Sequence, residues 1–169
     1  MVSAAGTTPV SAIWPIGQEG YLSDVRHELE ISPRHAASVL ATRAPAALID
    51  VRTAEERELF GAPPKAVHWP LAVVQRFRGE MPCPECETFS ARDLTPEERF
   101  EFVRWLVGHA VKQSALFFFC ARGNRSLVAA HILRDMGYPH AYSVAGGMQA
   151  WQNAGLPFVS VEAGGGDEA

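Results

Sequence analysis

Cys120 lies at the end of an apolar stretch, Leu116–Phe119, and directly before the polar segment 121–126. This segment contains two arginines and a glycine, and a helical pattern begins at Leu127. Backbone N–H groups, guanidinium groups and the positive end of a helix dipole all stabilise a thiolate relative to a thiol. The sequence therefore predicts a sulfur nucleophile at position 120. Gly123 would permit the backbone conformation that a loop closing around the sulfur needs.

Short apolar stretches alternate with helical patterns along the chain. We expect strands at residues 47–51, 66–69, 116–119 and 141–144, and helices at 32–43, 54–60, 95–111, 127–136 and 147–154. Residues 75–93 have no clear period and are predicted to form an inserted loop. The alternation is typical of an α/β domain with a parallel sheet, which binds ligands beyond the C-terminal ends of its strands. Asp50 and Cys120 each lie at such an end.

Length and composition limit the fold and the partners. The chain has 169 residues, 47% hydrophobic and 20% charged, which is enough for one domain with a full core. We expect an N-terminal arm over residues 1–28, one domain over 29–160 and a disordered tail over 161–169. The net charge of -4 does not favour binding to nucleic acid or to a membrane. Three cysteines and no secretory-signal pattern predict a reduced, cytoplasmic protein.

Three sequence motifs carry a resemblance to a known family. They are Leu48-Ile49-Asp50-Val51-Arg52, Cys120-x-x-Gly123-x-Arg125-Ser126, and the segment VAGGMQAWQNAGLP at residues 144–157. In their order and separation these motifs closely resemble the rhodanese homology domain, over about residues 30–158. The resemblance implies a five-stranded parallel sheet with helices on both faces. It also implies sulfurtransferase activity through a cysteine persulfide, with no cofactor.

Sulfur transfer needs a soft nucleophile that attacks a sulfur–sulfur bond and then carries the outer sulfur as Cys–S–S⁻ to an acceptor. Cys120 is the expected carrier. The donor would be a small molecule such as thiosulfate, and the acceptor a thiol or a protein. Converging N–H groups of the loop would stabilise both anions without a general base. The predicted anion-binding loop consists of Ala121, Arg122, Gly123, Asn124, Arg125 and Ser126.

The arginines near the loop have different expected roles. Arg122 would bind an anionic donor at the mouth of the loop, and a solvated surface arginine is the alternative. By resemblance, Arg125 would pair with Asp50 and brace the loop against the sheet. Arg52 would belong to a similar supporting network.

Backbone conformation near the predicted site gives three further expectations. Gly146 and Gly147 would allow close backbone packing against the site. Asn124 tolerates unusual backbone angles and could cap the following helix. The segment 61–66, Gly-Ala-Pro-Pro-Lys-Ala, lacks the histidine that the family usually carries there, which we interpret as a difference in packing.

The sequence is also compatible with two alternative functions. Cysteine phosphatases share the nucleophile, the anion-binding loop and the following helix, but they place an arginine six positions after the cysteine. Here that position is Ser126, and the arginine is Arg125. The shorter loop suits a sulfur atom better than a phosphoryl group. The other alternative is a rhodanese-like sulfur carrier or protein-binding module with little turnover of its own.

Cys83 and Cys86 form a Cys-x-x-Cys pair within the predicted loop. Such a pair resembles half of a zinc knuckle, but zinc takes four ligands. His68, His109 or another subunit would have to complete the site, and we predict no metal. The alternatives are a redox pair that receives sulfur from the Cys120 persulfide or resolves it as a disulfide, and two thiols without a function.

Overall fold

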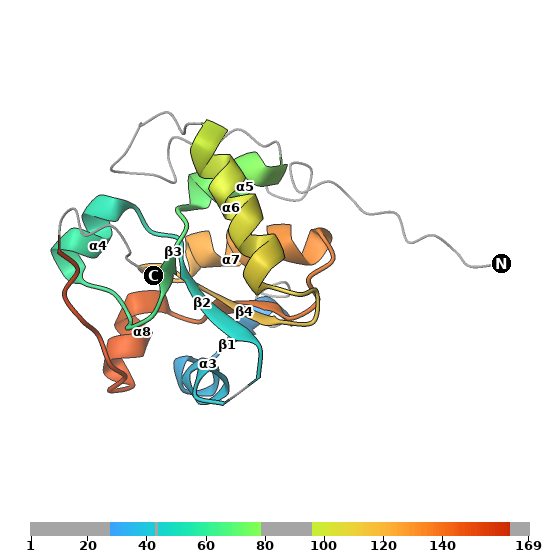
Figure 1. The fold of residues 1–169 in the computed structure, drawn as a ribbon. Coiled ribbons are helices and arrows are strands. Elements are labelled where there is room, and N and C mark those ends of the chain that lie inside the picture. The colour runs from blue at the N-terminus through green and yellow to red at the C-terminus, as the bar shows by residue number, and fades with distance from the viewer. Residues whose placement is uncertain (1–27, 43, 79–95, 163–169) are drawn as a thin grey trace, which may run out of the picture.

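The computed structural model describes residues 28–42, 44–78 and 96–162, which fold into a sheet covered by helices (Figure 1). The strands are β1 Glu30–Ile31, β2 Ala46–Asp50, β3 Val67–His68, β4 Ala115–Phe119 and β5 Ala141–Val144. The helices are α3 Pro33–Leu40, α4 Ala54–Phe60, α5 Leu71–Arg78, α6 Pro96–His109, α7 Asn124–Asp135 and α8 Gly147–Asn153. The five strands pair in parallel in the order β1-β5-β4-β2-β3. The predicted fold class is confirmed.

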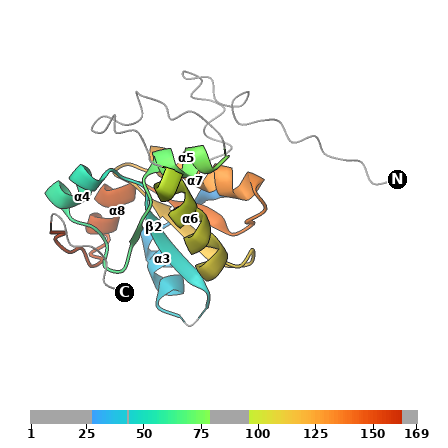
Figure 2. The same cartoon turned by 45° about the horizontal axis from the view of Figure 1, so that its top comes forward.

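Helices cover both faces of the sheet (Figures 1 and 2). Successive side chains of β4 point to opposite faces, so they pack against different layers of helices. Leu116, Phe118 and Cys120 belong to the core cluster that β4 shares with α5, α6 and α7. Phe117 and Phe119 point the opposite way, into the cluster formed with α3 and α8. The sheet is thus buried on both sides, as parallel sheets usually are.

The chain reverses its direction of travel across the sheet between β2 and β4. From β2 it passes to the edge strand β3, and then returns to form β4 on the other side of β2. The ends of β2 and β4 are level, because Asp50 pairs with Phe119. A crevice at the C-terminal ends of strands around such a reversal is the usual ligand site of an open parallel sheet. Cys120, which follows Phe119, lies at this point.

Local capping signals set the starts of two helices. Ser32 accepts a hydrogen bond from the backbone N–H of His35, and Pro33 follows at the first helical position of α3. Thr53 and Glu56 form a reciprocal capping box at the start of α4. Among the helices described, none is long and apolar enough to cross a membrane.

The prediction of a loop from residue 75 onward is wrong for its first part. Residues 75–78 belong to α5, whose buried residues Leu71–Gln75 are consecutive. A continuous buried stretch shows no helical period, so the pattern did not indicate a helix. The remainder of the predicted loop, with Cys83 and Cys86, lies outside the described residues. The two-residue strand β1 was also missed, because it is too short to show an alternation.

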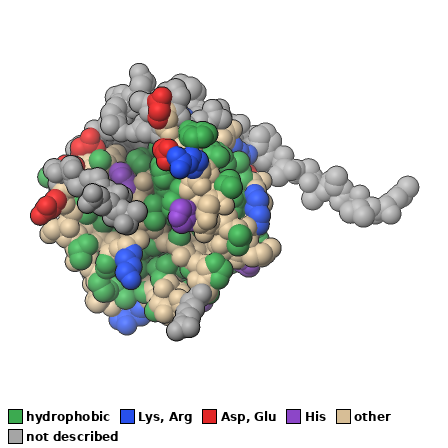
Figure 3. Space-filling view, in the orientation of Figure 1, with side chains coloured by type: hydrophobic (Ala, Val, Ile, Leu, Met, Phe, Trp, Pro, Cys, Tyr) green, Lys and Arg blue, Asp and Glu red, His purple; other side chains and the backbone are tan. Residues whose placement is uncertain are grey.

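Helix α6 packs one aromatic side chain into the core and exposes another. The ring of Phe102 is fully buried and meets the rings of Trp69 and Phe77 edge to face, with 5.3 Å between centroids in each pair. Phe100, two residues earlier, is 61% exposed. Figure 3 shows apolar side chains interspersed with charged ones on the face that includes α6.

We predict that Phe102→Ala lowers the free energy of unfolding by about 3–5 kcal/mol, because it leaves a cavity among aromatic rings. The matched control Phe100→Ala changes an exposed ring on the same helix and should stay within about 0.5 kcal/mol of wild type. Urea unfolding followed by circular dichroism measures both variants. Equal effects of the two substitutions would contradict this packing of α6.

Candidate active site

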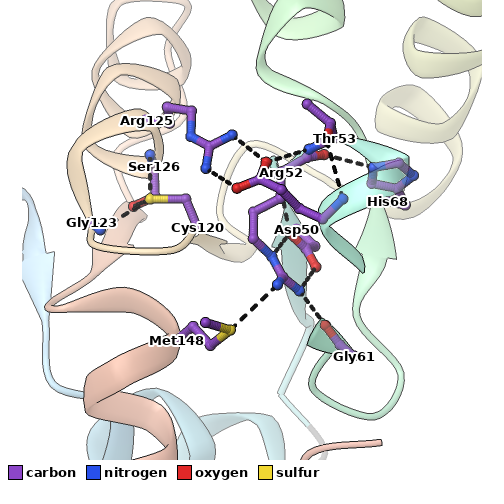
Figure 4. Close-up of polar contacts among 11 residues, drawn as sticks. Asp50, Arg52, Thr53, Gly61, His68, Cys120, Gly123, Arg125, Ser126 and Met148 are labelled. Carbon is purple, nitrogen blue, oxygen red and sulfur yellow. Dashed lines mark hydrogen bonds and ion pairs between the residues drawn. The ribbon is translucent and has the colours of Figure 1, made fainter. Parts of the chain in front are cut away.

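The sulfur of Cys120 is enclosed by hydrogen-bond donors at the start of α7 (Figure 4). The residue is only 1% exposed. The backbone N–H of Gly123 donates to Sγ at 3.0 Å and that of Ser126 at 3.4 Å, while the Ser126 hydroxyl lies 3.2 Å away. Gly123 caps α7 with φ +94°, a left-handed conformation that glycine adopts without strain. The sulfur therefore lies where the helix dipole also favours negative charge.

The loop after β4 is held against the start of α8 through its backbone. The N–H of Met148 donates to the carbonyl oxygens of Cys120, at 2.9 Å, and Ala121, at 3.1 Å. Gly147 has φ +55°, and a Cβ atom there would collide with the Cys120 carbonyl oxygen. A Cβ on Gly123 would lie 3.2 Å from the backbone nitrogen of Gly146. The absence of side chains at Gly123 and Gly147 thus permits the close contact between the loop and α8.

Arg125 pairs with Glu56 rather than with Asp50. Both terminal nitrogens of the guanidinium donate to the two carboxylate oxygens of Glu56, each at 2.6 Å. The expected pairing with Asp50 is wrong, because Asp50 already receives two hydrogen bonds from the guanidinium of Arg52. The Glu56 carboxylate also accepts the N–H of Thr53 at 3.0 Å, so the capping box of α4 holds it in place. The brace of the loop therefore runs from α7 to α4.

Asp50 and Arg52 form a second, fully buried ion pair beneath the loop. The guanidinium contacts the two carboxylate oxygens at 3.0 and 2.7 Å and donates to the Gly61 carbonyl at 2.7 Å. It lies over the ring of Phe119, 5.2 Å from the centroid, and a further nitrogen donates to the Met148 sulfur at 3.6 Å. This network joins the end of β2 to the last residue of β4 and to α8.

The electrostatics of the brace favour its charged form. Burial acts to raise the pKa of Glu56, but hydrogen bonds from Arg125 and Thr53 outweigh it, and the pKa lies below its ordinary 4.5. Burial likewise acts to lower the pKa of Arg125, but the Glu56 carboxylate outweighs it and raises the pKa. A negative charge on Cys120 would act in the same direction on Arg125. The ion pair and the sulfur are therefore electrostatically coupled.

The family of the protein follows from its sequence together with this geometry. Residues 32–154 match the sequence family described as the Rhodanese-like domain. The chain belongs to that family. A search among curated proteins found no match.

Solved structures of rhodanese-like and related proteins share the fold. A protein from Rhodopseudomonas palustris, named as a possible tyrosine phosphatase, is 19% identical, with 94% of this chain and 100% of that chain covered and a TM-score of 0.55. The polysulfide-sulfur transferase of Wolinella succinogenes is also 19% identical, with coverages of 88% and 91% and a TM-score of 0.55. The human single-domain sulfurtransferase is 24% identical, with coverages of 73% and 95% and a TM-score of 0.50.

Two other predicted residues of this rhodanese-like loop lie at the surface. Arg122 is exposed, which fits both the predicted donor-binding role and a solvated surface arginine. Asn124 is also exposed, but it does not cap α7, because the cap is Gly123 and Asn124 is the first helical residue.

The histidines considered as metal ligands have other contacts. The Nε2 atom of His68 donates to the Arg52 carbonyl at 2.7 Å, and burial lowers the pKa of His68, so its ring is neutral at pH 7. Nδ1 of His109 lies 3.1 Å from the Trp105 carbonyl. Within the described residues, no group of three or more His, Cys, Asp or Glu side chains could hold a metal ion.

Sequence reasoning missed the parts of the site that come from distant segments. Glu56 had a local signal, since Thr53-x-x-Glu56 is a capping-box pattern, but nothing in that pattern identifies Arg125 as its second partner. Met148 and Ser143 meet the loop only through the packing of α8 and β5.

We predict that Glu56→Gln lowers the free energy of unfolding by about 1–3 kcal/mol at pH 7, because Arg125 loses its counter-charge while glutamine can still accept from Thr53. Folding lowers the pKa of Glu56, so the unfolded chain binds that proton more tightly. The contribution of the charge is therefore complete above pH 4.5 and is lost as the pH falls below it.

The difference in stability between wild type and Glu56→Gln should consequently shrink as the pH falls below 4.5. Denaturant unfolding across this range measures it. Glu55→Gln, at an exposed position one residue earlier, is the matched control and should stay close to wild type at each pH. A constant difference between wild type and Glu56→Gln over the whole range would show that the charge is not what stabilises the pair.

Proposed function

We propose that the protein is a sulfurtransferase in which Cys120 accepts sulfane sulfur from a small donor such as thiosulfate and passes it to a thiophilic acceptor. The observation that carries the proposal is the convergence of two backbone N–H groups and one hydroxyl on a single sulfur atom. Such donors stabilise an anion at a fixed position. Membership of the rhodanese-like family and the fold shared with two named sulfur transferases support the same reading.

The chemistry needs no proton transfer. In the loading step, the Cys120 thiolate attacks the outer sulfur of thiosulfate, and the electron pair of the sulfur–sulfur bond leaves with sulfite. In the discharge step, an acceptor such as cyanide attacks the terminal sulfur of Cys–S–S⁻. The electron pair of that bond then returns to Sγ, which gives thiocyanate and the thiolate. Among the described contacts of Sγ there is no imidazole or carboxylate, so the surroundings suit this base-free route.

Phosphatase activity is the nearest competing reaction, because one structure with the same fold is named as a possible tyrosine phosphatase. A phosphatase needs guanidinium donors for the equatorial oxygens of a phosphoryl group. Here both terminal nitrogens of Arg125 are engaged by Glu56. The next residue is Ser126, whose backbone N–H and hydroxyl both contact the sulfur of Cys120. The loop is therefore arranged around one sulfur atom rather than around a tetrahedral oxyanion.

We predict that purified wild type, incubated with thiosulfate and freed of excess donor, gains the mass of one sulfur atom on the peptide that contains Cys120. It should then convert cyanide to thiocyanate, and Cys120→Ser should reduce both signals to the background. Intact-mass and peptide mass spectrometry with a thiocyanate assay measure them.

An aryl phosphate serves as the competing substrate in the same preparation. Hydrolysis that disappears in Cys120→Ser, without sulfur on the wild-type peptide, would replace the proposal with a phosphatase. Sulfur that loads on Cys120 but is discharged only to a specific protein would favour the low-turnover carrier module instead.

Arg122 is proposed to bind the anionic donor from the mouth of the loop. We predict that Arg122→Ala raises the KM for thiosulfate about tenfold with little change in kcat, because one charge-assisted hydrogen bond to the donor is worth about 1.4 kcal/mol or more. Arg122→Lys keeps the charge and should recover most of the affinity. Steady-state kinetics of thiocyanate formation measure both constants. A fall in kcat at unchanged KM would contradict this role.

A further inference from the structure

A line of buried hydroxyl groups continues from the Cys120 sulfur into the sheet. The Ser126 hydroxyl lies 3.2 Å from Sγ and 2.8 Å from the hydroxyl of Ser143 on β5. The Ser143 hydroxyl also lies 3.3 Å from the carbonyl oxygen of Gly123 and can donate to it. Both serines are fully buried. Ser143 does not touch the sulfur in any described contact, so it can act on the sulfur only through Ser126.

Each hydroxyl has one hydrogen and can accept others, so the line has two consistent directions. When Cys120 is a thiol, its hydrogen points to Ser126, Ser126 donates to Ser143, and Ser143 donates to the Gly123 carbonyl. When Sγ carries negative charge, Ser143 donates to Ser126 and Ser126 donates to the sulfur. The Gly123 carbonyl keeps a partner in the second arrangement, because the N–H of Leu127 donates to it at 3.3 Å.

We propose that Ser143 is a positioning residue, which orients the Ser126 hydroxyl toward the Cys120 sulfur whenever that atom becomes negatively charged. The proposal rests on the sulfurtransferase function and assigns one of its steps. During discharge, the bond between Sγ and the terminal sulfur breaks and its electron pair moves to Sγ. A donor aimed at Sγ stabilises this developing charge, and a hydroxyl that itself accepts a hydrogen bond is a stronger donor.

During loading, the negative charge on Sγ changes in the opposite direction from discharge. Loading begins with charge on Sγ and ends with that charge on the terminal sulfur, so the bond from Ser126 is already present at the start and weakens as the reaction proceeds. Loss of Ser143 should therefore slow discharge without slowing loading. A purely structural effect on the loop would slow both half-reactions together.

The test measures the two half-reactions separately. Wild type is loaded with thiosulfate, the excess is removed, and discharge to cyanide is followed by rapid quenching and mass spectrometry. Loading is followed in the same way from the sulfur-free protein. We expect Ser126→Ala to slow discharge about tenfold, and Ser143→Ala about threefold, on the scale of a cooperative contribution to one charge-assisted hydrogen bond. In a Ser126→Ala background, Ser143→Ala should have no further effect.

Matched variants exclude an effect of packing. Ser143→Thr keeps the hydroxyl, whereas Ser143→Val has almost the same shape as threonine but no hydroxyl. The Ser143→Thr variant should therefore discharge about threefold faster than the Ser143→Val variant. This pair decides the question if Ser143→Ala does not fold. Ser114→Ala removes another buried serine hydroxyl, one without a hydrogen-bond partner in the described structure, and should leave both rates unchanged.

The outcomes separate this inference from the proposed function. If wild type takes up no sulfur on Cys120, the sulfurtransferase function itself fails. If wild type loads and discharges normally, three results would each overturn the role of Ser143: discharge by Ser143→Ala at the wild-type rate, equal slowing of both half-reactions, or independent effects of the two serines. Equal discharge rates of the Thr and Val variants would also overturn it.

Discussion

The close approach of two backbone segments, the loop after β4 and the start of α8, is the constraint on which the site depends. The Met148 N–H reaches two successive carbonyls of the loop, and this requires that Gly147 carry no side chain. This contact holds the first two peptide groups of the loop, and later in the same loop the N–H groups of Gly123 and Ser126 donate to the sulfur. These donors belong to a backbone that is held by packing, and such preorganisation is what makes fixed dipoles effective in catalysis.

The ion pairs around the loop hold it in place, but burying their charges costs desolvation free energy. Hydrogen bonds to neighbouring groups offset this cost. A buried pair gains little unless its geometry is good and its remaining polar atoms are bonded. The pair between Arg125 and Glu56 is bidentate, and the carboxylate takes a further hydrogen bond from Thr53. The lowered pKa of Glu56 shows that these bonds outweigh its burial. The pair thereby links the first turn of α7 to α4.

Local patterns in the sequence were enough to predict the class of fold and the position of Cys120, because both depend on residues close together in the chain. The strand before Cys120 and the glycine-containing loop after it are contiguous, and so are the caps of α3 and α4. The partner of Arg125 could not be predicted in this way. Asp50 ends β2 and Glu56 lies in the helix that follows, and only the side-chain contacts show that Asp50 is already paired with Arg52. Helix α5 was missed because its buried residues are consecutive, and Ser143 because its contact depends on the register of β5 beside β4.

Burial of Cys120 has a consequence for the direction of the proposed reaction. An acceptor that attacked Sγ itself would expel hydrosulfide and remain attached to the protein as a mixed disulfide or thiocyanate adduct, which would stop turnover. Which of two sulfurs is attacked depends on access as well as on the leaving group. Sγ is enclosed by the start of α7 and by Ser126, and the residue is almost fully buried. In the proposed persulfide the terminal sulfur would be the outer atom. The same donors that make Sγ a good leaving group therefore also shield it from attack, so enclosure and electrostatics favour the same productive bond cleavage.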